Sequence, residues 1–363
     1  MKYNYSISEK AIIILDSLEG LEYKHKVAIL STVNNPENLL DNRRFKIEAL
    51  TGIIDESKLK TVIAAFDEDY IEYTLKKYDE LGTIVVTKAS CLYPQSLENI
   101  SAPPLCLYCN GDLKLLKSKC FAIVGSRKCP TYTSALVKEY AEVLVENGIT
   151  VVTGSAGGVD KAAIEGSLSG NGKIISILAG GIKHVYPEYN KNLIAEVTKK
   201  GLVVSEQNPF IMPKPWMFPV RNRIIAGLSD GVLIAAGEKQ SGSRHTASFA
   251  LEYGKEVFAY PYSIGIPSGE LNNELIKEGA MLCDCVDDIL FFLGIEKKTE
   301  KNNILLEEDE KKVLSAIKDG FDDVTKLVNK TGLKMYELAP ALSSLEILGL
   351  IVKMPENTYK SIK

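Results

Sequence analysis

The sequence predicts an α/β protein whose centre is a doubly wound parallel sheet. Two observations predict it. Between residues 119 and 293, short apolar segments alternate with amphipathic segments that have helical periodicity. The apolar segments are nearly continuous, as expected of strands that are buried on both faces. Parallel strands need long crossovers, and the intervening helices supply them.

We expect six strands in this region, with five helices between them at right-handed crossovers, which makes the domain Rossmann-like. The strands are expected at residues 120–124, 149–153, 173–178, 202–205, 232–236 and 256–260. The helices are expected at residues 133–146, 160–168, 189–200, 221–227 and 243–253.

The flanking segments predict three further parts of the chain. Residues 1–82 are expected to form an N-terminal helical domain, with helices at 9–18, 24–31, 38–50 and 68–81. Residues 83–295 form the Rossmann-like domain, which begins with an extended, proline-containing lead-in at 83–117. A polar linker, 296–303, precedes a module at 304–363. Helices at 309–318, 322–329 and 334–348 and a hairpin at 350–354 and 358–362 predict a winged helix there.

Composition excludes several classes of protein. Hydrophobic residues make up 45% and charged residues 25%, and the formal net charge is −4, so the chain is no histone-like polycation. The longest apolar runs, residues 11–15 and 289–293, are far shorter than the ~20 residues of a membrane span. The N-terminus lacks a signal-peptide pattern. We therefore expect a soluble, cytoplasmic protein.

The cysteines and histidines do not predict a metal site or a cofactor. An odd count of seven cysteines indicates a reducing compartment rather than a disulfide scaffold. Cys106 and Cys109 have metal-like spacing but lie in an apolar run, and Cys283 and Cys285 also fit structural thiols better. The three histidines are dispersed, so no metal and no cofactor is expected.

Two loops that follow adjacent strands have the composition of phosphate-binding loops. In an open parallel sheet, ligands bind beyond the carboxyl ends of the strands. The expected phosphate contacts there are Gly125, Ser126, Arg127, Gly154, Ser155, Gly157, Gly158 and Asp160. Glycines expose backbone amides to an anion, and arginine offers a planar fork of donors. One such loop could be only a tight turn, but two favour a site. No dinucleotide fingerprint is present.

Two more elements add cations at helix starts. Arg221 and Arg223 bracket Asn222, and Trp216 and Phe218 lie just upstream, where they could stack on bases or serve as core residues. Both arginines could reach one groove; alternatively, one pairs with a carboxylate such as Glu206. The second element is Ser241, Gly242, Ser243 and Arg244. Residues 183–255 carry ten Lys or Arg against six Asp or Glu.

These motifs resemble the DprA/Smf family of DNA-processing proteins. The matching segments are 124–127, 153–160, 179–190, 201–206, 218–229, 241–243 and 257–261, in family order across about 170 residues, and 218–229 is the most specific. The chain departs from the usual pattern at Ile164, Ala235 and Tyr262, where a histidine, a glutamate and a glycine are customary.

The resemblance implies a homodimeric protein that binds single-stranded DNA, protects incoming DNA and loads RecA recombinase during natural transformation. It implies a mediator and not an enzyme, with a sterile-alpha-motif-like N-terminal domain. Two alternatives stay open: a nucleotide-processing Rossmann enzyme of the phosphoribohydrolase type, and a nucleotide-sensing module. The enzyme would need a positioned acid, which position 235 does not supply.

Overall fold

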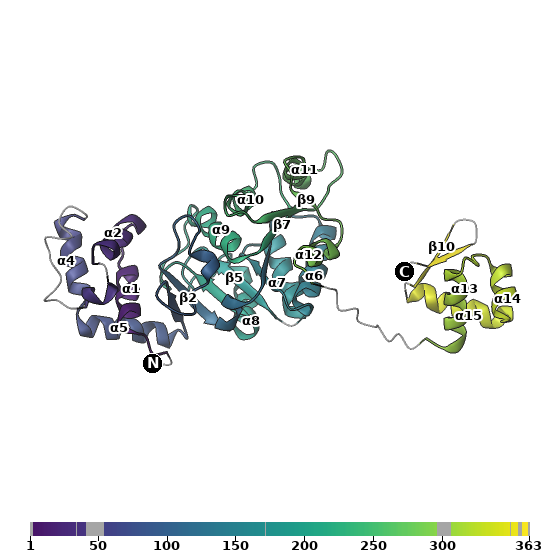
Figure 1. Cartoon of the computed structure of the whole chain (residues 1–363), viewed down its shortest axis with the longest axis horizontal. Coiled ribbons are helices and arrows are strands. Elements are labelled where there is room, and N and C mark those ends of the chain that lie inside the picture. Colours follow the sequence, from purple (N-terminus) through teal and green to yellow (C-terminus); the bar gives the residue numbers. More distant parts are fainter. Residues whose placement is uncertain are drawn as a thin grey trace. The chain divides into compact units, whose positions relative to one another are not determined.

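The computed structural model describes residues 3–33, 35–40, 54–170, 172–295, 306–348, 350–354 and 358–361. The chain forms two compact units, residues 1–297 and 298–363 (Figure 1). Most of the helix expected at 38–50 and the whole linker expected at 296–303 lie outside the described residues. The boundaries that the sequence suggests within the first unit stay predictions.

The first unit is built on a nine-stranded sheet with the order β1-β2-β6-β5-β4-β3-β7-β8-β9. The strands are β1 (Ile84–Thr87), β2 (Cys106–Gly111), β3 (Cys120–Gly125), β4 (Thr150–Thr153), β5 (Ile174–Leu178), β6 (Leu202–Ser205), β7 (Gly231–Ala236), β8 (Glu256–Ala259) and β9 (Met281–Leu282). Neighbouring strands from β6 through β5, β4, β3, β7 and β8 to β9 are all parallel. This confirms the predicted doubly wound parallel sheet.

The lead-in at 83–117 differs from the prediction, because it extends this sheet. Strand β2 pairs antiparallel with both β1 and β6. An antiparallel strand can join a sheet edge without a crossover helix, so helical periodicity gave no sign of it. The short strand β9 also escaped prediction, since Met281 and Leu282 are both exposed and give no buried pattern.

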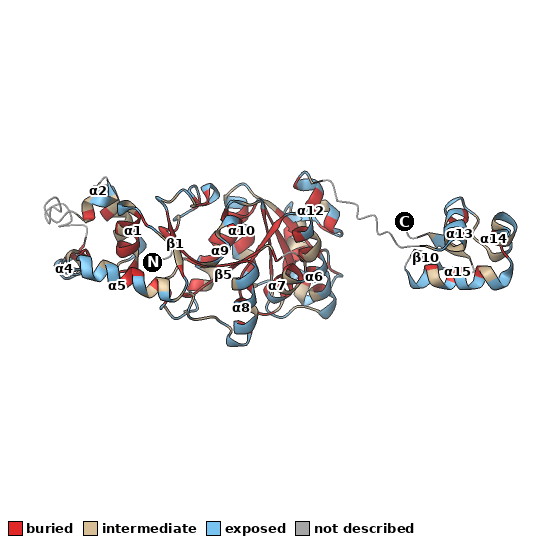
Figure 2. Cartoon of the chain, turned by 90° about the horizontal axis from the view of Figure 1, so that it is seen from below, coloured by how far each residue is buried: buried red, intermediate tan, exposed pale blue. Residues whose placement is uncertain are grey.

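Helices cover both faces of the sheet. One face carries α6 (Thr131–Glu146), α7 (Val159–Ser169), α8 (Lys191–Lys200) and α12 (Val286–Phe292); the other carries α9 (Met217–Leu228), α10 (Ser243–Glu252) and α11 (Glu270–Lys277). Strand β3 shows the pattern: Phe121 and Ile123 belong to the first core cluster, and Ala122 and Val124 to the second. Figure 2 shows the buried residues between the helical layers.

The direction of winding reverses between β3 and β7. Strand β3 pairs with β4 on one side and with β7 on the other. The loop after β3 leads to α6 on one face, whereas the loop after β7 leads to α10 on the opposite face. The two loops therefore diverge and leave a crevice at the carboxyl ends of these strands. Such a switch point is where open α/β sheets bind their ligands.

The N-terminal helices pack together and against the β1–β2 edge of the sheet. They are α1 (Ile7–Ser17), α2 (Tyr23–Val33), α4 (Glu56–Ala65) and α5 (Glu68–Glu80). The sequence did not predict α4, which begins after an Asp55 cap whose side chain accepts the Lys58 N–H. The Val85 N–H donates to the Tyr5 hydroxyl at 2.9 Å, and Tyr78 packs edge-on against Tyr108 of β2.

The second unit has a core of its own. It contains α13 (Glu308–Lys318), α14 (Val324–Thr331), α15 (Met335–Ile347) and a hairpin of β10 (Ile351–Lys353) and β11 (Tyr359–Ser361). Val313, Leu327, Leu338 and Leu345 are its buried centre. Three helices and then a hairpin is the element order from which the winged helix was predicted. Among the described residues, no helix of either unit is both long and apolar enough to cross a membrane.

Candidate functional site

A cavity of about 490 Å³ lies at the switch point between β3 and β7. The loops after these two strands, the start of α7 and the first turns of α9 supply its walls. Ten of the residues that the sequence singled out line it: Gly125, Ser126, Arg127, Asp160, Phe218, Arg221, Asn222, Ser241, Gly242 and Ser243. The rule that ligands bind at strand ends therefore located the cavity correctly.

The remaining residues of the glycine loop support the cavity from behind rather than line it. A side chain on Gly154 would collide with the Asp160 carboxylate and the Arg221 guanidinium. Gly158 has a φ of +67°, and a side chain there would collide with the backbone oxygens of Ser126 and Arg127. Gly154 and Gly158 are thus needed for close approach of neighbouring groups. Ser155 and Gly157 are buried beside them.

Arg221 and Asp160 form a buried pair of opposite charge at the floor of the cavity. Arg221 is 7% exposed and Asp160 is 6% exposed. The Arg221 guanidinium donates to the Ile177 carbonyl oxygen, and Asp160 Oδ2 accepts the Ala156 N–H at 3.2 Å. Burial raises the pKa of Asp160 and lowers that of Arg221, while their mutual attraction opposes both shifts. These contacts fix Arg221 before any ligand binds.

Arg127, like Lys128, is an exposed cation of the cavity wall. Its guanidinium carbon lies 5.2 Å from the centre of the Phe218 ring, within the range of a cation–π contact. The Phe218 ring is in turn met edge-on by Tyr186, with ring centres 5.7 Å apart. Trp216 is 58% exposed, so it is not the core residue that the sequence left as an alternative.

Arg223 does not share the groove of Arg221, so the prediction that both reach it is wrong. Arg223 is 5% exposed, and its Nη2 donates to Glu206 Oε1 at 2.5 Å and to the Ala102 carbonyl oxygen at 2.8 Å. The sequence pattern predicts that this helix begins only at residue 221. Helix α9 begins at Met217, so Arg221 and Arg223 both lie inside it. Side chains two positions apart in a helix point about 200° away from each other. The alternative, an ion pair with Glu206, is the one that forms.

Arg244 also lies outside the cavity lining. Its Nη2 pairs with Glu274 Oε2 at 2.5 Å. Sequence reasoning missed four polar lining residues, namely Lys128, Glu238, Gln240 and Thr246. Lys128 follows Arg127 directly, and Glu238 and Gln240 follow the end of β7. The rule that located the cavity could have included these three as well.

The cavity suits an anion better than a metal ion. Arg127, Lys128 and Arg221 line it, against two acids, Asp160 and Glu238. Serine hydroxyls and the start of α10 add donors. All seven cysteines carry free thiols; Cys106, Cys109 and Cys283 are buried, as expected, whereas Cys285 is exposed. In the described ranges, the metal-like group found is Asp284, Cys285 and Asp288, away from the cavity.

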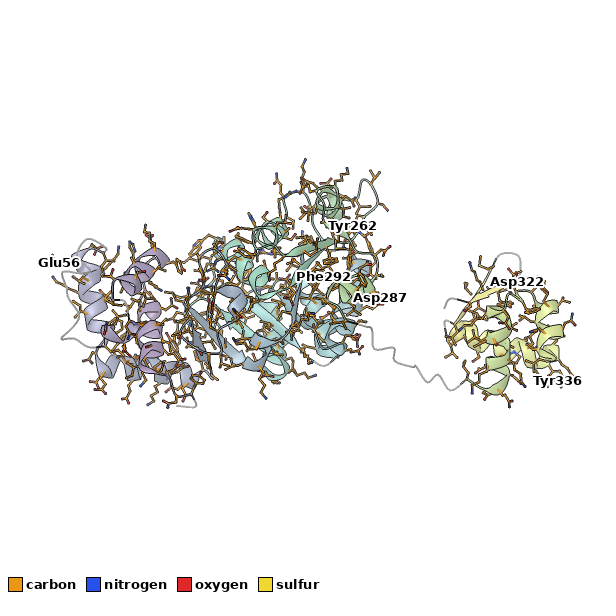
Figure 3. All side chains as sticks on the ribbon, viewed as in Figure 1. Glu56, Tyr262, Asp287, Phe292, Asp322 and Tyr336 are labelled. Atoms are coloured by element: carbon orange, nitrogen blue, oxygen red, sulfur yellow. The ribbon has the colours of Figure 1, made fainter. Side chains whose placement is uncertain are left out.

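The three departures from the family pattern lie in the core and not in the cavity lining. Ile164, Ala235 and Tyr262 belong to one buried cluster. The Tyr262 hydroxyl donates to the Ala235 carbonyl oxygen at 2.9 Å and lies 2.8 Å from the Thr133 hydroxyl. Figure 3 labels Tyr262. Ile164 and Ala235 contribute apolar side chains to this core, and the buried Tyr262 hydroxyl has hydrogen-bond partners.

The fold and the cavity define a class: a Rossmann-like protein whose switch-point pocket is lined by glycine, serine and arginine residues. The family model for DNA recombination-mediator protein A matches residues 84–294. The chain is 38% identical over 216 residues to DNA processing protein DprA of Bacillus subtilis, covering 59% of this chain and 73% of that protein. The chain therefore belongs to the DNA recombination-mediator protein A family.

Solved structures agree with this assignment. The crystal structure of DNA processing protein A from Streptococcus pneumoniae superposes with a TM-score of 0.67 at 29% identity, covering 81% of this chain and 99% of that one. A structure of the Helicobacter pylori protein superposes with a TM-score of 0.53 at 32% identity, covering 58% and 95%. That study describes how the Helicobacter pylori protein binds single-stranded DNA.

Proposed function

We propose that this chain binds single-stranded DNA in the switch-point cavity and acts as a recombination mediator in the cytoplasm. It would protect incoming DNA and load RecA recombinase onto it during natural transformation. Membership of a family of DNA recombination mediators supports the loading step, and the single-strand binding described for the Helicobacter pylori protein supports the ligand.

The observation that carries the proposal is the pairing of Arg127 with Phe218 above the fixed cation Arg221. Guanidinium groups bind phosphates, and an aromatic ring can stack on a base. A base is available for stacking only where it is unpaired, so a cavity with both kinds of group favours a single strand over a duplex. The ligand would be held through its backbone, with affinity that falls as salt rises.

The same residues support a binding protein rather than an enzyme. An enzyme that cleaves a glycosidic bond needs a positioned acid. The buried carboxylate of the cavity, Asp160, already accepts a backbone N–H and faces Arg221. The other acid, Glu238, is exposed at the rim. No cofactor is needed for the proposed role.

A homodimer completes the proposal, and the β9 edge is its most suitable surface. Strand β9 is the last strand of the sheet, and both of its side chains are exposed, Met281 by 45% and Leu282 by 48%. Phe291 of the neighbouring α12 is 87% exposed. Exposed apolar side chains beside a free strand edge favour association with a second copy. Leu282→Lys with Phe291→Lys should convert a dimer to a monomer in analytical ultracentrifugation.

The decisive experiment measures binding of fluorescent oligothymidine and of a duplex of equal length at several salt concentrations. We expect tight binding of the single strand, weaker binding of the duplex, and a loss of affinity in Arg127→Ala. Loading would be measured as faster RecA ATP hydrolysis on strands already covered by single-strand-binding protein. Equal affinity for both DNA forms would contradict the proposal, as would release of ribose 5-phosphate from nucleotides.

A further inference from the structure

A short segment, residues 186–190, is tied to the glycine loop behind the cavity. The Ser155 hydroxyl donates to the Tyr186 carbonyl oxygen at 3.1 Å. In return, the Asn190 amide donates to the carbonyl oxygens of Ser155 and Ala156, at 2.9 and 3.0 Å. Asn190 is 1% exposed. Because these hydrogen bonds connect both ends of the segment to one loop, its position relative to the cavity is fixed.

Two large aromatic side chains on this fixed segment face solvent. Tyr186 is 50% exposed and Tyr189 is 73% exposed. A Tyr ring can stack through its apolar faces while its hydroxyl stays in water. Aromatic rings that stand on a fixed backbone segment and are open to solvent are suited to receive a ligand.

Both rings lie at the rim of the cavity. The Tyr186 ring meets Phe218, a lining residue, at an interplanar angle of 70°. The Tyr189 hydroxyl lies over Gly157, where an added Cβ would be 2.5 Å from it. Gly157 directly follows Ala156, which lines the cavity. Any larger residue at position 157 would displace the Tyr189 ring.

The charges around the segment match a phosphate backbone. Lys183 and Lys191 are exposed on either side of the two tyrosines, and the acid between them is Glu188. Lys183 also lies 5.2 Å from the Phe210 ring centre, so another aromatic ring continues the surface. A strand that leaves the cavity past Phe218 would meet cations for its phosphates and flat rings for its bases.

We infer that Tyr186 and Tyr189 form an aromatic shelf on which unpaired bases stack as the strand leaves the cavity. This inference rests on the proposed function and deepens it, because the shelf adds stacking contacts to bases beyond the one that Phe218 offers in the cavity. Stacking on a ring does not distinguish one base from another, so the shelf gives affinity without sequence preference.

The test compares two strands that differ only in their bases. One is oligothymidine of about 15 nucleotides, and the other has abasic tetrahydrofuran units in place of the central thymidines, with the same phosphates. The full-length chain should bind the base-bearing strand about tenfold more tightly. Tyr186→Ala with Tyr189→Ala should lose most of this preference, keeping only the part that Phe218 supplies, with an unchanged salt slope.

Matched variants separate stacking from other roles. Tyr186→Phe with Tyr189→Phe should keep the preference, because the rings remain. Tyr73→Ala removes a similarly exposed tyrosine, 55% exposed on α5, and should change nothing. Circular dichroism melting verifies that each variant is folded.

Three results would overturn the inference. The preference could survive undiminished in the double Ala variant, the variant could lose affinity equally for both strands, or loss of the two tyrosines could affect only the binding of a protein partner. Failure of the proposed function looks different. In that case the unaltered chain binds neither strand.

Discussion

Replacement of Arg127 by alanine should impair DNA binding, whereas replacement of Arg223 by alanine should impair stability. Arg127 is exposed at the cavity wall, whereas Arg223 is buried against Glu206. We therefore expect Arg127→Ala to weaken single-strand binding in a stable protein. Arg223→Ala should destabilise the protein while the remaining folded molecules bind DNA with nearly full affinity.

The size of the Arg223 effect follows from burial. The Arg223 side chain is 6% exposed and that of Glu206 is 19% exposed. Removing one partner of a buried ion pair costs about 3–5 kcal/mol, because the other charge is left without compensation. Glu206 keeps some contact with water, so we expect the lower end, about 3 kcal/mol. For a unit of this size, that loss lowers the melting temperature by roughly 6–12 °C.

The loss of stability in Arg223→Ala should depend on pH. Burial raises the pKa of Glu206, and Arg223 opposes that shift. Without Arg223, the folded-state pKa rises further above the unfolded value. A raised carboxyl pKa favours folding below the unfolded pKa, and that benefit disappears as pH rises through the folded pKa. The stability deficit of Arg223→Ala should therefore grow as the pH rises above the unfolded-state pKa of Glu, about 4.3.

For Arg127→Ala, the expected size of the binding defect is given by the salt dependence of DNA affinity. Loss of one phosphate contact lowers the slope of log Kobs against log salt by roughly 0.7 for a single strand. The contact with the Phe218 ring is exposed and worth about 0.5–1 kcal/mol, so stability should change little.

Urea unfolding, followed by circular dichroism, measures the stability of each variant. Fluorescence anisotropy with labelled oligothymidine measures its affinity for DNA. Adding Glu206→Gln to Arg223→Ala should recover about 1 kcal/mol, since it removes the uncompensated charge. If Arg223→Ala kept its stability and lost binding, Arg223 would contact DNA and the separation of the two arginines would be refuted. An unchanged affinity and slope in Arg127→Ala would remove Arg127 from the site.

Three further outcomes are expected. Truncation after Asn303 should leave a folded chain, because the second unit has its own core. Most of the single-strand affinity should remain, because residues 296–363 carry twelve cations and twelve acids and so have no basic excess. A tenfold loss of affinity, about 1.4 kcal/mol, would contradict this. The single tryptophan, Trp216, is exposed at the start of α9, so its fluorescence should change when oligothymidine binds; an unchanged spectrum at saturation would place the strand elsewhere. Burial raises the pKa of Asp160, and its protonation would remove a negative charge from the cavity, so affinity for oligothymidine should rise as the pH falls. Asp160→Asn should bind more tightly and lose this dependence in anisotropy titrations, and an undiminished dependence would show that another group is responsible.

Sequence patterns predicted the strands well because burial on two faces leaves a strong apolar signal. The strand expected at 202–205 has those bounds in the structure, and the strand ends located the cavity. The antiparallel strand β2 was harder to predict, since its partner β6 is distant in sequence and prolines interrupt the lead-in. Such pairing is a tertiary property, which no local period encodes.

Side-chain direction was the weakest part of the site prediction. Arg221, Arg223 and Arg244 look equivalent as cations near helix starts, yet only Arg221 lines the cavity. The difference arises from where α9 begins and from the carboxylates that Arg223 and Arg244 meet, Glu206 and Glu274. Neither the first residue of the helix nor the carboxylate partner of an arginine can be read from composition. The surroundings of Tyr186 and Tyr189 likewise depend on hydrogen bonds to a loop some 30 residues away.

The strand order has a consequence for how the chain folds while it is being synthesised. Strand β2 pairs through Tyr108 with Ser205 of β6, and β3 pairs through Ala122 with Val232 of β7. At about 5–20 residues per second, the edge of β2 that pairs with β6 would stay without its partner for roughly 5–20 s during synthesis. During that interval the N-terminal helices, which pack on β1 and β2, can already assemble and cover part of this hairpin. The cavity would be completed only after β7 and the start of α10 have left the ribosome, so a nascent chain acquires its ligand pocket late.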